Sequence, residues 1–189
     1  GVQCQYFSQR THTFGHGNII KYTNRPFLKE VDKAALEANG GSWHDGTWKG
    51  TRSSNHHISR DAIDMMNDHF TDRINEMVGP NDTLWHLGDW AFAQKDKYYH
   101  KCRFYRDRIK CQNIFFVFGN HDNREIANLF TKCYDQVSLS INNQMFHLNH
   151  YCCAIWNKSH RGAIHLYGHS HSNAEAGLDR IMPGRRSMD

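Results

Sequence analysis

Aspartate, asparagine and histidine residues collect in three short motifs, and each motif follows an apolar run. The motifs are Gly88-Asp89, Gly119-Asn120-His121-Asp122 and Gly168-His169-Ser170-His171. The runs before them cover residues 84–87, 114–118 and 164–167, and each predicts a short buried strand that stops at a glycine, where the backbone can turn sharply. Strands of one sheet that end at the same edge would bring these side chains together. We therefore expect a metal-dependent active site there.

The ligand types of these motifs narrow the choice of metal. Asp89 supplies a carboxylate whose two oxygens can each bind a cation, and Asn120 supplies a neutral oxygen. His150, which follows a predicted strand at residues 144–149, joins His169 and His171 as a source of imidazole nitrogen. Such a mixed nitrogen and oxygen site suits Mn, Fe, Zn or Ni rather than Ca or Mg.

His121 and Asp122 have the chemistry of a general acid and its orienting carboxylate. An imidazole beside the metals could bind a phosphoryl oxygen and protonate the leaving group, with Asp122 fixing its tautomer. A positioned acid of this kind is worth roughly a hundredfold to ten-thousandfold in rate. Asn and Asp also favour turns, so residues 120–122 could form only a turn. That alternative leaves the neighbouring motifs unexplained.

Length and composition set broad limits on the protein. The 189 residues suffice for one domain, and 23 basic against 19 acidic residues give a net charge of +4, which suits an anionic substrate without favouring nucleic acid. Six cysteines without a CxxC pair predict a reduced, cytoplasmic protein. No apolar stretch approaches the roughly 20 residues of a membrane span, and no signal sequence is evident, so we expect no membrane partner.

Helices and strands mix along the chain, which predicts the α/β class. One helix is expected to open at Pro26, with an apolar face of Leu28, Val31, Ala35 and Ala38. A second helix begins after Ser59, and its apolar face consists of Ile63, Met66, Phe70, Ile74 and Met77. A third covers residues 94–110, a short one covers residues 124–130, and strands follow at residues 136–141 and 144–149. Residues 42–58 predict a long insertion loop, either a lid beside the active site or a plain surface insertion.

The ordered motifs, together with His150-Tyr151, resemble the signatures of calcineurin-like metallophosphoesterases, and residues 14–27 resemble the start of the small bacterial and phage members. The resemblance implies a single domain, a four-layer α/β/β/α sandwich, with a centre of two divalent transition-metal ions, Mn being favoured over Fe, Zn or Ni. It implies that Asp89 bridges the metals, that Asn120, His150 and His169 complete one site, and that His171 belongs to the other. His121 is then the catalytic histidine.

The first motif of that family differs in this chain. The family begins with Asp-x-His, whereas this chain has Arg10-Thr11-His12-Thr13. A one-residue slip brings His12 into the ligand position, and Arg10 cannot ligate a cation. Either the first metal site is impaired, with Arg10 holding the phosphate directly, or residues 1–13 come from a reading-frame error, because a neighbouring frame can encode Asp-x-His. Sequencing the gene would distinguish the two.

The predicted function is hydrolysis of phosphomonoester or phosphodiester bonds, with a phosphorylated small molecule or nucleotide as substrate. Two cations about 3.5 to 4 Å apart would activate a water and align in-line attack, while His121 assists the leaving group. The alternatives are a nuclease of the same superfamily and a metal-binding module impaired by the missing first aspartate. The abrupt end at residue 189 also predicts a truncated C-terminus.

Overall fold

The structure is a computed structural model that describes residues 4–8, 13–22, 25–38, 40, 42–44, 47–49, 58–170 and 175–189. The chain divides into two compact units. The first comprises Gly1–Thr13 and Ile74–Asp189, and the second comprises Phe14–Arg73. None of the helices in the described ranges has the length and apolarity that crossing a membrane requires.

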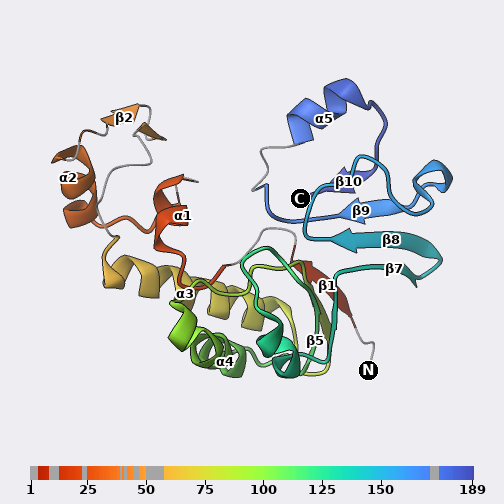
Figure 1. Ribbon diagram of the computed structural model, residues 1–189, viewed down its shortest axis with the longest axis horizontal. Helices are drawn as coiled ribbons and strands as arrows, with labels where there is room; N and C mark the ends of the chain where they lie inside the picture. Colours follow the sequence, from red (N-terminus) through yellow and green to blue (C-terminus); the bar gives the residue numbers. More distant parts are fainter. Residues whose placement is uncertain are drawn as a thin grey trace. The chain divides into compact units, whose positions relative to one another are not determined.

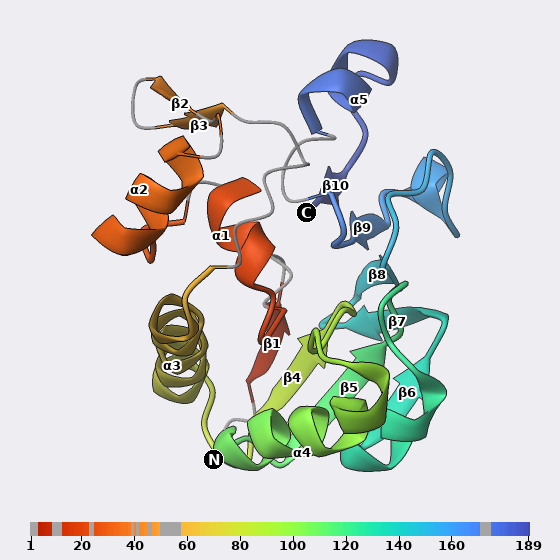
Figure 2. The same cartoon turned by 60° about the vertical axis from the view of Figure 1, so that its left-hand side comes forward.

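A parallel sheet of four strands forms the centre of the first unit. Its order is β1-β4-β5-β6, with β1 at Gln5–Ser8, β4 at Thr83–His86, β5 at Asn113–Val117 and β6 at Lys132–Tyr134 (Figure 2). Every residue of β4 is buried, as is typical of a parallel strand covered on both faces. The predicted strands at residues 84–87 and 114–118 are thus confirmed. Strand β6 was not predicted, because its three residues are too few to show the alternation of apolar and polar side chains that indicates a strand.

The second sheet has the order β10-β9-β8-β7 and mixes the two pairing types (Figure 1). Strands β7 (Gln136–Ile141) and β8 (Gln144–Asn149) form an antiparallel hairpin, while β9 (Ile164–Leu166) runs parallel to β8, and β10 (Ser187–Met188) runs parallel to β9. Asn142 and Asn143 turn the hairpin at positive φ of 48° and 66°, which asparagine tolerates better than most residues. The strands predicted at residues 136–141, 144–149 and 164–167 are confirmed.

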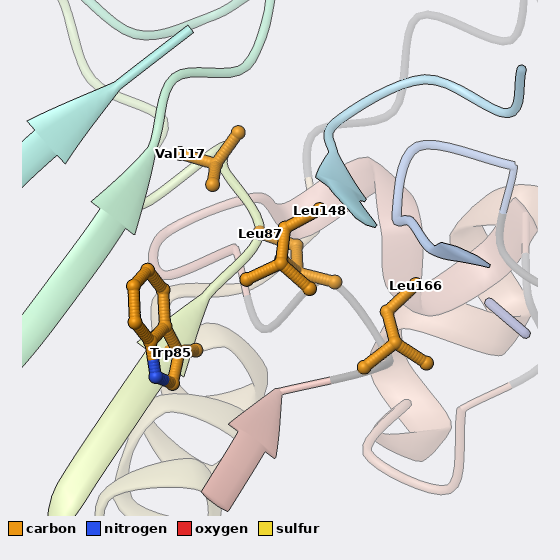
Figure 3. Close-up of a cluster of buried hydrophobic side chains, with 5 residues drawn as sticks. All are labelled: Trp85, Leu87, Val117, Leu148 and Leu166. Atoms are coloured by element: carbon orange, nitrogen blue, oxygen red, sulfur yellow. The ribbon is translucent and has the colours of Figure 1, made fainter. Parts of the chain in front are cut away.

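One hydrophobic core cluster of the first unit lies between the two sheets. Figure 3 shows its buried side chains, which are Trp85, Leu87 and Val117 from the first sheet and Leu148 and Leu166 from the second. Burial of each aliphatic side chain contributes about 1.5 to 3 kcal/mol relative to exposure. This packing sets the position of the strand ends from which the polar motifs emerge.

Helical segments cover the outer face of the first sheet (Figure 2). The helix α4 (Tyr98–Arg108) buries Tyr98, Cys102 and Tyr105, as its sequence period predicts, and the 3-10 helix η1 (Lys95–Lys97) precedes it. The 3-10 helix η2 (Arg124–Leu129) leads to Phe130, whose ring stacks on Phe116 of β5 at 4.3 Å. The unit also contains η3 (Ser159–Arg161) and α5 (Glu175–Ile181). Helices, a parallel sheet and a mixed sheet define the α/β class, while the complete four-layer sandwich stays a prediction.

The second unit contains the helices α1 (Gly17–Tyr22) and α2 (Glu30–Ala38), and α3 (Arg60–Met77) crosses its boundary. The predicted cap of α3 is confirmed, because Ser59 Oγ accepts from the amide of Ala62 at 3.4 Å. Met77 is wrong as a core residue, since it is 52% exposed at the last position of the helix.

Two other expectations in the second unit are wrong. Helix α2 begins at Glu30 rather than at Pro26, and it buries Asp32 and Leu36 while Val31 is 65% exposed. The carboxylate of Asp32 decides this orientation, because it accepts hydrogen bonds of 2.7 Å from both the amide and the hydroxyl of Ser59.

The expected loop at residues 42–58 contains an antiparallel hairpin of β2 (Ser42–His44) and β3 (Thr47–Lys49). Tryptophan and threonine favour such pairing, but strands of three residues are too short to show a period. Residues 50–57 of the expected loop lie outside the described part of the chain, so the lid stays a prediction.

His165 makes the stability of the first unit depend on pH. Its ring is fully buried, Nδ1 pairs with the carbonyl of His147 at 3.0 Å, and Nε2 accepts from the amide of Cys153 at 3.0 Å. Burial lowers the pKa of His165 to about 4 from an ordinary 6.5, and the pKa of His147 is lowered by burial as well. A proton on Nε2 would also displace the Cys153 hydrogen bond.

We predict that the free energy of unfolding is highest above pH 6.5 and falls as the pH drops from about 6.5 to about 4, because only the unfolded chain then takes up a proton at His165. The loss from this residue is up to about 3 kcal/mol. Urea unfolding between pH 7 and pH 4 measures it. His165→Phe, which cannot titrate, should show a smaller slope than His100→Ala, which removes an exposed imidazole; equal slopes would contradict the prediction.

Candidate metal centre

The candidate metal centre lies where four strand ends of the first unit meet. Gly88-Asp89 follows β4, Gly119-Asn120-His121-Asp122 follows β5, His150 follows β8, and Gly168-His169 follows β9. The ring of His150 joins the two sheets, because its Nδ1 lies 2.7 Å from the carbonyl oxygen of Leu87. The amide of Gly168 donates to the carbonyl of His150 at 3.0 Å and brings the β9 end alongside.

Four of the predicted ligands come together at this point. Ligand atoms of Asp89, His150 and His169 all lie within 4.8 Å of one another. Nε2 of His150 is 3.0 Å from Asn120 Oδ1 and 3.3 Å from Asp89 Oδ2. Asp89 and His150 are buried, whereas His169 and Asn120 are exposed. The arrangement is a half-buried set of nitrogen and oxygen donors that opens to solvent on one side.

The hydrogen bonding of His150 shows that this set suits a cation. A carbonyl can only accept, so Nδ1 carries the proton that it donates to Leu87, and whenever the ring is neutral its lone pair is at Nε2. That lone pair faces two further acceptors, the oxygens of Asn120 and Asp89. Three converging acceptors are stabilised by a proton or by a metal ion between them. The donors present therefore fit a divalent transition metal.

The pKa values of His150, Asp89 and His169 are shifted by burial and by their neighbours in the site. Burial by itself would lower the pKa of His150, but the hydrogen bond and negative charge of Asp89 outweigh it and raise that pKa. Burial likewise opposes ionisation of Asp89, yet its pKa is lowered by His150 and by the amide of His121, which donates to Oδ1 at 3.0 Å. The pKa of His169 is lowered, first by burial and then by the charge of His150.

The backbone of the site is strained at two of its ligands. Asp89 has a φ of 54° and His169 a φ of 66°, in the left-handed region that L residues rarely occupy. Close packing of the loops also explains two glycines of the motifs. A Cβ on Gly88 would lie 2.6 Å from His150 Nδ1, and one on Gly119 would lie 2.2 Å from Asp89 Oδ1. Any side chain at these glycines would displace a ligand.

Asp122 joins the β4 and β5 loops through hydrogen bonds to their main chain, and its predicted role of orienting the His121 ring stays a prediction. Its Oδ2 accepts from the amides of Asp89 and Gly119, both at 2.7 Å. Its Oδ1 accepts from the amide of Trp90 at 2.9 Å and from the hydroxyl of Tyr98 at 3.2 Å. Loss of solvent raises the pKa of Asp122, while the amide hydrogen bonds oppose that shift. The short polar side chain therefore joins the β4 and β5 loops.

His121 lies beside the candidate ligands, and its side chain is exposed. Its amide is fixed by Asp89, and its ring contacts Phe92, with centroids 5.6 Å apart and planes at 77°. Tyr151 packs against the His169 ring at a centroid distance of 4.8 Å. Both aromatic side chains are about half exposed, at 49% and 48%.

Sequence reasoning missed several members of this site. The Leu87 carbonyl and the Tyr98 hydroxyl carry no sequence signal, and Phe92 lies outside every motif, whereas the position of Tyr151 directly after His150 could have indicated its contact. Two predicted ligands, His12 and His171, lie outside the described residues, as does Arg10.

Comparison with known proteins identifies no family. No protein-family model matches the chain, and no curated protein matches it. A solved structure described as the protein of unknown function AQ665 from Aquifex aeolicus is similar, with 20% identity and a TM-score of 0.45. The similarity covers 79% of this chain and 61% of that one, so the chain spans less than two thirds of that protein's length. A likeness this distant carries no function across.

We predict that Asp122→Asn destabilises the first unit by about 2 to 4 kcal/mol, because an amide nitrogen in place of one oxygen leaves two donors without their acceptor. Urea unfolding at pH 7 measures the change. The matched control is Asp96→Asn, an exposed carboxylate on η1, which should stay within about 0.5 kcal/mol of the wild type. Equal stability of the two variants would show that Asp122 does not support the loops.

Proposed function

We propose that this protein is a metal-dependent phosphoesterase that hydrolyses phosphomonoester or phosphodiester bonds. The observation that carries the proposal is the convergence of Asp89, Asn120, His150 and His169 around one point, with Nε2 of His150 within 3.3 Å of oxygens of both Asn120 and Asp89. The exposed His121 beside this point adds a proton donor. The motif order described above, which resembles that of calcineurin-like metallophosphoesterases, supports the same function.

Each side chain has a distinct task in this proposal. Asp89, Asn120, His150 and His169 hold the cations, and Leu87 keeps the His150 tautomer that leaves Nε2 available. Bound divalent cations supply charge neutralisation of the phosphoryl oxygens and activation of water. His121 binds a phosphoryl oxygen and gives its proton to the departing alkoxide, because the imidazole is exposed and its backbone is fixed by Asp89.

Metal content and hydrolysis test this function together. The full chain loaded with Mn should bind metal and hydrolyse para-nitrophenyl phosphate or its bis-ester, and chelation should abolish the activity. His121→Ala should keep the metal but lower kcat by roughly a hundredfold to ten-thousandfold. Asp89→Asn should lose both metal and activity, because it removes a ligand that contacts His150.

The control for these variants is His100→Ala, which removes an exposed imidazole of α4 and should match the wild type in metal content and rate. Metal binding with equal slow rates in the wild type and His121→Ala would contradict the enzyme and indicate a metal-binding module instead. Absence of bound Mn, Fe, Zn or Ni in the wild type would contradict the metal centre itself.

A further inference from the structure

A second hollow of the first unit lies outside the candidate metal centre. Its volume is about 400 Å³, and it lies between the chain that follows β8 and the chain that joins α5 to β10. The side chains that define its chemistry are Ile155, Trp156, His160, Met182, Arg185 and Arg186. Asp89, Asn120, His150 and His169, the candidate metal ligands within the described residues, are not part of its lining. Small-molecule sites in proteins are typically of this size, roughly 300 to 1,000 Å³.

The charge of this hollow is one-sided. Two guanidinium groups and one imidazole line it, and the described residues of its lining include no aspartate or glutamate. Arg186 is exposed and donates from Nη1 to the carbonyl of Gly162 at 2.9 Å, which anchors one end of its guanidinium at the rim. An anion would meet attraction here without a competing carboxylate.

Arg185 is held rigidly and is incompletely paired. Its Nε donates to Ser187 Oγ at 2.6 Å, its Nη2 donates to Cys152 Sγ at 3.0 Å, and its guanidinium lies 5.6 Å from the ring centroid of Trp156. Its Nη1 is buried and has no acceptor among the described residues. The positive charge of Arg185 is thus kept in the wall of the hollow, where it attracts an anion.

The remaining wall is apolar and preformed. Trp156 is buried, it contacts the Arg185 guanidinium and the His165 ring, and its Nε1 donates to the carbonyl of Ala163 at 2.9 Å. Ile155 beside it is 79% exposed, and Met182 adds a flexible apolar surface. The hollow thus combines fixed cations with exposed apolar area.

We infer that this hollow binds a small organic anion, with its phosphate, phosphonate or carboxylate group against Arg185 and Arg186 and its apolar body against Ile155 and Met182. The site is separate from the metal centre and does not depend on the phosphoesterase function. The lining indicates this class of ligand, because its cations attract an anionic group and its apolar side chains favour contact with the apolar part of the same molecule.

Isothermal titration of the full chain in a metal chelator tests this site, with phenylphosphonate, benzoate and the neutral benzyl alcohol as probes. At least one anion should bind saturably, and benzyl alcohol should bind at least about tenfold more weakly. Comparing phenylphosphonate with benzoate identifies the preferred charged group. Equal binding of the neutral probe, or no saturable binding of any anion, would overturn the inference.

Variants assign the binding to this hollow. Arg186→Gln removes an exposed charge and should weaken binding at least about tenfold without unfolding the chain. The matched control Arg161→Gln removes a neighbouring exposed charge that does not line the hollow, and it should stay within about twofold. Asp89→Asn should also leave binding unchanged. Anion binding that falls in Asp89→Asn but not in Arg186→Gln would place it at the metal centre and reject this hollow.

Discussion

The candidate centre depends on one carboxylate that bonds to main chain rather than to substrate or metal. Asp122 gathers the amides of Asp89, Gly119 and Trp90, so two loops from neighbouring strands are fixed by a single side chain. Loop backbones carry donors that must be satisfied, and here one acceptor group satisfies three of them. With these amides held, Asp89 is kept at its unfavourable φ of 54° and its carboxylate meets His150.

The second constraint is the contact between the two sheets. The core of Trp85, Leu87, Val117, Leu148 and Leu166 aligns their strand ends, and the hydrogen bond from His150 to Leu87 joins the sheets next to that core. The same carbonyl selects the tautomer of the ring. The packing of the two sheets therefore places the Leu87 carbonyl against Nδ1 of His150, so that Nε2 faces the other candidate ligands.

The far side of the second sheet shows how buried polar groups can serve structure alone. His165 is neutral because burial lowers its pKa, and its two ring nitrogens pair with main-chain groups of His147 and Cys153. Trp156 contacts both the His165 ring, at a centroid distance of 5.2 Å, and the guanidinium of Arg185. The chain has 15 histidines, and these contacts separate those that fix the fold from those that converge on the candidate centre.

The sequence by itself determined the elements with strong local signals. Apolar runs that end at glycine predicted β4, β5 and β9, the helical period predicted α4, and the strand-end motifs predicted that Asp89, Asn120, His150 and His169 lie together. These predictions succeed because the apolar pattern of a strand or helix is a local property of the sequence, and because parallel strands of one sheet end at the same edge. Short strands such as β2, β3 and β6 carry too few residues for a period and could not be predicted.

Only the tertiary structure decided which groups the polar side chains bond. No signal in the sequence indicated that Asp122 bonds three amides and Tyr98, or that Asp32 is buried against Ser59. The hydrogen bonds of a carboxylate depend on donors that are distant in the chain, and residue type and spacing do not contain that information. The grouping of Asp89, Asn120, His150 and His169 could therefore be predicted from the sequence. The main-chain groups that hold their loops were decided by how distant parts of the chain fold together.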